Sequence, residues 1–114
     1  MGTTKLAKSD WHSYFDRLAK SLHASEVAIE VASLSMGDQV IAQGAALAGI
    51  TYDPKGGDLT ISTDRLEHRI ITPVEIYLQG TAEALGSLEV LDNAGNKHIA
   101  KITPRLMIVG SSTK

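Results

Sequence analysis

Residues Glu67 to Leu78 read EHRIITPVEIYL, a stretch that alternates like a β-strand but contains a proline. In one uninterrupted strand the even-numbered residues share a face, and His68 would be among them. The adjacent pair Ile70 and Ile71, followed by Pro73, instead predicts a bulge or corner at or before the proline, because proline lacks a backbone donor. A one-residue bulge reverses the facing of every residue before it, so the direction of His68 stays open.

Short strands separated by turns are predicted on both sides of this stretch. Beyond the corner we expect Val74, Ile76 and Leu78 to enter the core, because the alternation resumes there. Elsewhere, turn-forming residues recur at 35–39, 54–58 and 92–96. The small side chains of residues 44–49 are typical of a bent strand that another backbone approaches closely.

A single helix is predicted before the strands. Four apolar residues recur at helical spacing after the N-cap candidates Ser9 and Asp10, and the helix is expected to end near residues 23–25. The stripe consists of Trp11, Phe15, Leu18 and Leu22. We expect it to pack on the sheet rather than to dock a partner, because so short a helix is only marginally stable alone.

The predicted fold class is α+β, with an N-terminal helix packed on a small, strongly bent antiparallel sheet or partly open β-barrel of five to seven strands. A chain of 114 residues holds one core of ordinary size. We expect a flexible N-terminus at residues 1–9, a single α+β domain at residues 10–110 and a flexible C-terminus at residues 111–114.

The composition argues against several classes of function. The net charge of −2 gives no general attraction to nucleic acid or to an anionic membrane. The absence of cysteine excludes disulfides and thiolate chemistry and suits a reducing cytoplasm, where we expect the protein to be located. No apolar run has the roughly 18 residues that a membrane span needs.

His68 is the residue to which chemistry is most easily assigned. It is a candidate general base, metal ligand or pH-sensitive contact, although a structural histidine paired with a carboxylate such as Glu67 is the favoured interpretation. His68 and His98 lie on separate predicted strands that are able to meet, but no third ligand is specified, so we predict no metal and no cofactor. Turn formation explains Asp53 and Asp58 without catalysis.

Phosphate-binding glycine loops and nucleophile elbows are missing from the sequence. An enzyme is therefore disfavoured. The segment Leu106, Met107, Ile108 and Val109 is apolar on both faces of a strand and needs cover on both sides, which makes these residues candidates for a subunit interface.

Several short motifs follow one another along the chain: Trp11 with 14–16, Val27 with Ile29 and Glu30, 47–53, 68–70 with Pro73, Ile76 with Tyr77, and 92–95. Together they resemble a family of small bacterial domains of unknown function. The resemblance covers residues 10 to 102 and implies no activity, substrate or catalytic residue. It makes His68, Pro73 and Tyr77 the first positions to examine. The candidate contacts for a ligand or partner are His68, Arg69 and Tyr77.

The architecture also looks like the Sm-like and SH3-type small barrels, which often assemble into rings or bind RNA. From these observations we expect a non-enzymatic protein-binding or assembly module that forms a homo-oligomer. The alternatives are a nucleic-acid-binding small barrel, for which basic loops and aromatic platforms are few, and a small enzyme that uses His68. The sequence does not identify a small-molecule ligand.

Overall fold

The computed structural model describes residues 3–21, 24–33, 35–81 and 84–104. Its elements in chain order are β1 (Thr4–Leu6), the 3-10 turn η1 (Lys8–Asp10), α1 (Trp11–Ser21), β2 (Ser25–Ser33), β3 (Gly37–Tyr52), β4 (Leu59–Thr63), β5 (Glu67–Ile70), β6 (Pro73–Gly80), β7 (Leu85–Asp92) and β8 (Lys97–Pro104). The predicted combination of one N-terminal helix and a bent antiparallel sheet is confirmed.

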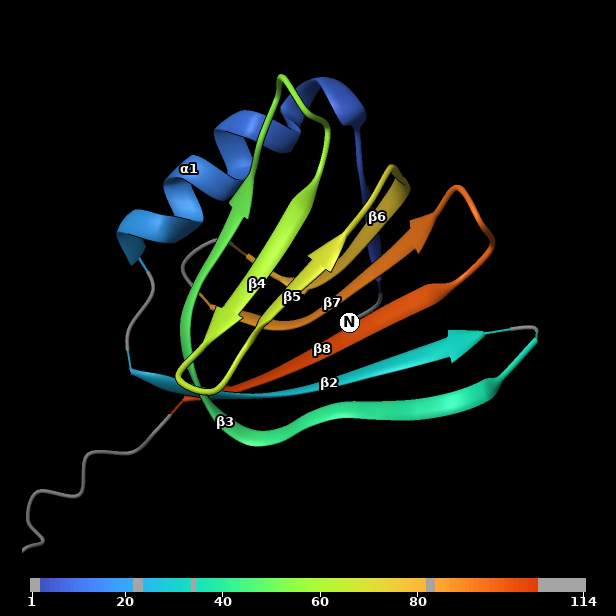
Figure 1. Cartoon of the computed structure of the whole chain (residues 1–114). Coiled ribbons are helices and arrows are strands. Elements are labelled where there is room, and N and C mark those ends of the chain that lie inside the picture. The colour runs from blue at the N-terminus through green and yellow to red at the C-terminus, as the bar shows by residue number, and fades with distance from the viewer. Residues whose placement is uncertain (1–2, 22–23, 34, 82–83, 105–114) are drawn as a thin grey trace, which may run out of the picture.

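The strands form one open antiparallel sheet in the order β1-β6-β7-β8-β2-β3-β4-β5. β3 belongs to both parts of this sheet, because Gly37–Ala46 pairs with β2 whereas Leu47–Tyr52 pairs with β4. The strand bends between the two halves, so β4 and β5 cross over the strands β6, β7 and β8 in Figure 1. The bend encloses the core between the two parts of the sheet.

The helix packs against β3 by the part of its apolar stripe that the structure describes, Trp11, Phe15 and Leu18; Leu22 lies outside the described residues. Trp11 and Phe15 are buried, the Trp11 ring meets the Tyr52 ring edge-on with 5.5 Å between centroids, and the Trp11 Nε1–H donates to the carbonyl of Leu6 at 3.0 Å. Ser9 lies in η1, which precedes α1 directly. None of the helices in the described ranges has the length and apolar character to cross a bilayer.

The core is mainly aliphatic, with Trp11, Tyr14 and Phe15 as its buried aromatic residues. Its largest fully buried side chains come from the helix and from both parts of the sheet: Trp11, Leu18, Val27, Ile29, Leu59, Ile61, Ile70, Ile76, Leu88 and Val90. Burial of an aliphatic side chain of this size contributes about 1.5–3 kcal/mol of transfer free energy. The helix and the bent sheet therefore share one core.

One expectation about the fold, the number of strands, is wrong. The sheet has eight strands, not five to seven, because β1 was not anticipated and residues 67–78 form two strands, β5 and β6. The N-terminal residues 1–9, expected to be flexible, include β1, which pairs antiparallel with β6. The sheet is open, since β1 and β5 are its two ends, and the resemblance to Sm-like and SH3-type barrels is not confirmed.

Val74 also departs from expectation, because it is 47% exposed while Ile76 and Leu78 are buried as predicted. A register shift between Pro73 and Glu75 places an extra residue in β6 opposite β7. That bulge reverses the facing before it, so Pro73 takes the buried position and Val74 points outward.

Candidate functional site

The tight turn between β7 and β8 holds an aspartate in a fixed position. The Asp92 Oδ1 accepts the backbone N–H groups of Ala94 and Asn96, both at 2.9 Å, and Gly95 adopts a left-handed φ of 89°. The Asn96 side-chain amide donates to Oδ2 at 3.1 Å. These contacts leave Oδ2 free to accept one more hydrogen bond from the direction of β8.

Two histidines extend from this carboxylate into the space between the parts of the sheet. The His98 Nε2 lies 2.8 Å from Asp92 Oδ2, and the His98 Nδ1 lies 2.9 Å from the Nε2 of His68. His98 is only 7% exposed, whereas His68 is half-buried. We call Asp92, His98 and His68 the histidine chain.

The open question about His68 is therefore answered: it points inward. His68 lies opposite Ile61 of β4, and His98 lies between Val90 of β7 and Val31 of β2. Because β5 pairs with β4 alone in the strand order, the contact between the two histidines joins an edge strand to the middle of the sheet. The prediction that the two histidines are able to meet is confirmed.

The ionised carboxylate of Asp92 determines which ring nitrogens of His98 and His68 carry a proton. Burial alone would raise the pKa of Asp92, but the hydrogen bonds from His98, Asn96 and Ala94 outweigh it and leave the pKa below its ordinary value. The ionised carboxylate only accepts, so His98 donates its Nε2–H to it. In neutral His98 the Nδ1 is then an acceptor, and His68 donates its Nε2–H there, leaving its own Nδ1 unprotonated.

His68 is the more exposed end of the histidine chain. Burial, and secondly the electrostatic effect of His98, lower its pKa below 6.5. The histidine chain is not arranged as a metal site, because Asp92 accepts a hydrogen bond from the His98 Nε2, on the side of the ring that faces away from His68. Within the described ranges, no three His, Asp or Glu side chains converge as metal ligands would.

The corner that follows β5 is strained and tied to the same turn. Thr72 has a φ of 55°, a left-handed conformation that a β-branched residue rarely adopts. Its carbonyl accepts the N–H of Asn93 at 2.9 Å. The β7–β8 turn therefore holds both β5, through the histidine chain, and the corner after it.

The other two candidate residues do not join His68. Arg69 lies on the opposite face of β5 and forms an ion pair with Asp58 that includes a bond of 2.7 Å from Nε. Tyr77 lies on the outer face of the sheet and donates to Glu75 at 2.8 Å, which raises the pKa of Tyr77. Reasoning from sequence missed Asp92 because its turn chemistry already accounted for it.

A second feature is an unpaired strand edge. In the part of the chain that the structure describes, no strand pairs with the side of Gly37–Ala45 that faces away from β2. Register shifts opposite residues 27–30 of β2 mark β-bulges in β3 beyond Val40, and Gly44 has a φ of 64°. Only Gly37–Val40 keeps a regular register, and we call it the free edge.

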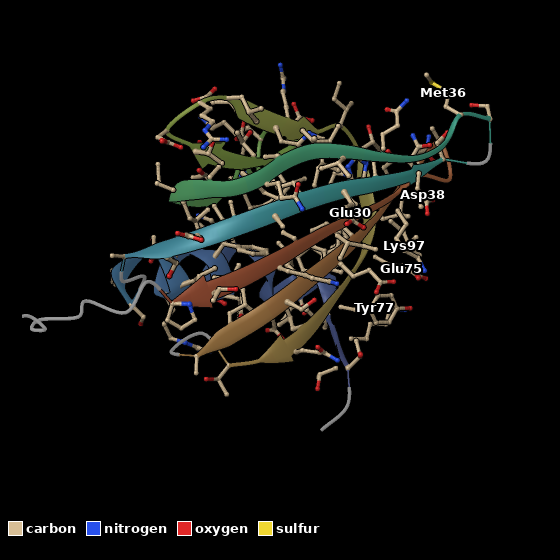
Figure 2. The ribbon with its side chains drawn as sticks, turned by 90° about the horizontal axis from the view of Figure 1, so that it is seen from below. Glu30, Met36, Asp38, Glu75, Tyr77 and Lys97 are labelled. Carbon is tan, nitrogen blue, oxygen red and sulfur yellow. The ribbon has the colours of Figure 1, made fainter. Side chains whose placement is uncertain are left out.

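Exposed apolar side chains adjoin the free edge. Met36 is 69% exposed and Val40 is 62% exposed. Figure 2 shows Met36 at the far end of the β2–β3 hairpin, away from Glu75 and Tyr77, and Asp38 nearer to Glu30 and Lys97. The four interface candidates Leu106, Met107, Ile108 and Val109 lie outside the described residues.

Comparison with known proteins identifies the family. Residues 2–108 match the family of unknown function DUF5335, and the chain belongs to this family. It is 36% identical over 107 residues to an uncharacterised protein of Aquifex aeolicus, covering 93% of this chain and 96% of that protein. The expected membership of a family of small domains of unknown function is therefore confirmed.

A solved structure shares the fold. The crystal structure of the Bacillus subtilis YojF protein is similar with a TM-score of 0.52 and 13% sequence identity, covering 96% of this chain and 100% of that chain. At this identity the likeness concerns the arrangement of helix and strands alone.

Proposed function

We propose that this member of a family of unknown function is a cytoplasmic assembly module that forms a homodimer, the smallest homo-oligomer, through the free edge of β3. The observation that carries the proposal is an unpaired strand segment with exposed apolar side chains and a single charged residue. A strand edge presents backbone donors and acceptors that pair readily with another strand.

The three edges of the sheet differ in how they are protected. β1 is only three residues long and carries Lys5, and β5 carries the two charged residues Glu67 and Arg69; very short length and charge both discourage pairing with another chain. β3 is 16 residues long, and Asp38 is the only charged residue in it. Its bulges protect the strand beyond Val40 but leave Gly37–Val40 regular.

A second copy fits this edge about a two-fold axis. With Gln39 opposite its own symmetry mate, Asp38 lies across from the partner's Val40 and not from another carboxylate. Like charges placed directly opposite destabilise a strand pair, and this register avoids them. The interface is isologous, as in most homodimers. Four residues make a short interface, so we expect a weak dimer whose population depends on protein concentration.

A substitution at Gln39 tests the proposal. Gln39 is exposed, and in the register above Gln39→Lys places two lysines directly opposite each other across the two-fold axis, so we expect a monomer where the wild type dimerises. Gln79→Lys is the matched control, because Gln79 is also an exposed strand glutamine but lies in β6. Sedimentation velocity measures both. A wild type that stays monomeric, or a Gln39→Lys chain that still dimerises, would contradict the proposal.

The apolar segment Leu106–Val109 supports assembly independently, on sequence grounds alone. A chain ending at Pro104 separates the two sources of association. If the truncated chain dimerises and Gln39→Lys does not, the free edge makes the interface. If truncation alone abolishes dimerisation, the C-terminal segment makes it and the edge proposal is wrong.

Acid–base catalysis at His68 is the second candidate function, since the histidine chain supplies the second titratable group that a catalytic His68 requires. Two pockets lie elsewhere: one between α1 and β3, lined by His12, Phe15 and Tyr52 among others, and one beside Gly44. The geometry thus supports assembly better. The outer face carries both signs of charge, such as Glu30 and Lys97 in Figure 2, which does not favour nucleic acid.

A further inference from the structure

We propose that the histidine chain is a proton-controlled latch that holds edge strand β5 against β8, and that acidification releases the strand. This inference is separate from the proposed dimer, since every residue in it belongs to one chain. It rests on the position of β5, on the direction of the hydrogen bonds and on the strained corner beside them.

β5 has few other attachments. It contains four residues and pairs with β4 alone in the strand order. Ile70 is buried in the core, and Arg69 contacts Asp58 on the other face. The bond between His68 and His98 is the polar contact that fastens the inner face of β5 to β8. Short edge elements of this kind open locally at lower free energy than a central strand.

Apart from Asp92, the residues that face the two histidines are apolar. Ile61 of β4 lies opposite His68, while Val31 of β2 and Val90 of β7 flank His98. Asp92 is the charged group that contacts His98, and the Asn96 side-chain amide donates to Asp92. On β5 itself, Glu67 and Arg69 alternate to the opposite face from His68.

Protonation of His68 explains how the latch responds to pH. The additional proton enters at the His68 Nδ1 and keeps both hydrogen bonds, but it places a charge in a half-buried site. When β5 is open, water hydrates His68, and the histidine then binds the proton more readily. Acid therefore shifts the equilibrium toward the open form.

The corner favours release as well. Thr72 is held at a φ of 55° and is tied to the β7–β8 turn through Asn93. A non-glycine residue in this region stores strain that the surrounding contacts must hold. Opening β5 allows Thr72 to relax. The strain at Thr72 therefore favours the open state, whereas the hydrogen bonds of the histidine chain favour the closed state.

Amide hydrogen exchange measured by NMR tests the latch. Corrected for intrinsic exchange rates, the protection of residues 67–70 relative to the central part of β8 should fall as pH drops through 6.5. We expect a change of about fivefold or more, the lower end of ordinary coupling between two sites. His68→Gln keeps a donor toward His98 but does not titrate, and should abolish the change. His12→Gln, on the exposed face of α1, is the matched control and should retain it.

Two results overturn the proposal. One is wild-type protection of β5 that does not respond to pH. The other is a pH response that persists in His68→Gln. Long-range ¹⁵N–¹H spectra of the wild type provide a readout that needs no variant: when both rings are neutral, His68 and His98 should each carry their proton on Nε2. A proton on the His68 Nδ1 would mean that the chain runs in the other direction, and the latch as proposed would be wrong.

Discussion

Replacing Asp92 by alanine should destabilise the domain far more than an ordinary turn substitution. The carboxylate accepts two backbone N–H groups, the Asn96 amide and the Nε2–H of His98. When the carboxylate is removed, the two backbone N–H groups and the Asn96 amide can donate to water instead. The His98 Nε2–H cannot, because His98 is only 7% exposed.

The magnitude follows from the cost of leaving a buried donor unpaired and of losing a charge-assisted hydrogen bond. Together we expect these effects to remove about 2–4 kcal/mol from the free energy of unfolding. Asp53→Ala is the matched control, because the Asp53 Oδ1 also accepts a turn N–H, that of Lys55 at 2.9 Å, but on the surface. That variant should lose about 0.5–1 kcal/mol. Urea denaturation followed by circular dichroism measures both.

The pH dependence of the same pair gives a second measure. Since the folded-state pKa of Asp92 lies below 3.8, its stabilising effect is fully present above pH 3.8 and is lost as pH falls through the lower folded value. The difference in free energy of unfolding between the wild type and Asp92→Ala should become smaller only in that acid range. Equal losses in the Asp92 and Asp53 variants, or a difference that is unchanged in acid, would refute this role of Asp92 in the histidine chain.

Two glycine substitutions and one threonine substitution test the backbone. Gly80→Ala should lower the free energy of unfolding by more than about 2 kcal/mol, because Gly80 has a φ of 106° and an added Cβ would lie 2.2 Å from the Ala84 carbonyl oxygen. Gly49→Ala is the control and should be nearly neutral, because the space around Gly49 is open. Thr72→Gly should stabilise by about 0.5–1 kcal/mol by relieving the left-handed strain, and Thr72→Ala should not. Thermal unfolding distinguishes these outcomes, and a stabilising Gly80→Ala or a destabilising Thr72→Gly would contradict the backbone assignments.

Local patterns predicted the local structure well. The helical spacing of Trp11, Phe15 and Leu18 identified the buried stripe of α1, because apolar residues that recur with a period near 3.6 form one face of a helix. The turn chemistry of Asp92 to Asn96 located the β7–β8 hairpin. The corner before Pro73 was also located, since two apolar neighbours and a missing donor cannot continue a regular ladder.

Non-local pairing could not be read in the same way. β1 has three residues, and what makes it a strand is β6, which lies far later in the chain. Whether the Val74 side chain points to the core or to solvent depends on a bulge in β6 opposite β7. The bulge shifts the alternation of inward and outward residues by one, and no residue pattern in the sequence indicates this shift. The free edge arises because β3 changes partner after Ala46, and nothing local in a strand specifies its second neighbour.

The candidate site was half predicted for the same reason. His68 and His98 were expected to be able to meet, but the part of Asp92 was missed. A signal existed: the tight turn pairs Leu91 with Lys97, so Asp92 and His98 are diagonal neighbours across the hairpin. Hairpin register, read before sites are assigned, would have found the carboxylate.

The most direct test of the proposed assembly is amide exchange at the free edge as a function of protein concentration. In the dimer the outward N–H groups of Gly37–Val40 are paired with a second copy, whereas in the monomer they meet water. We therefore expect their protection to rise with concentration, while the amides of β5 stay unchanged and Gln39→Lys loses the effect. Protection at Gly37–Val40 that is independent of concentration would contradict the proposed dimer.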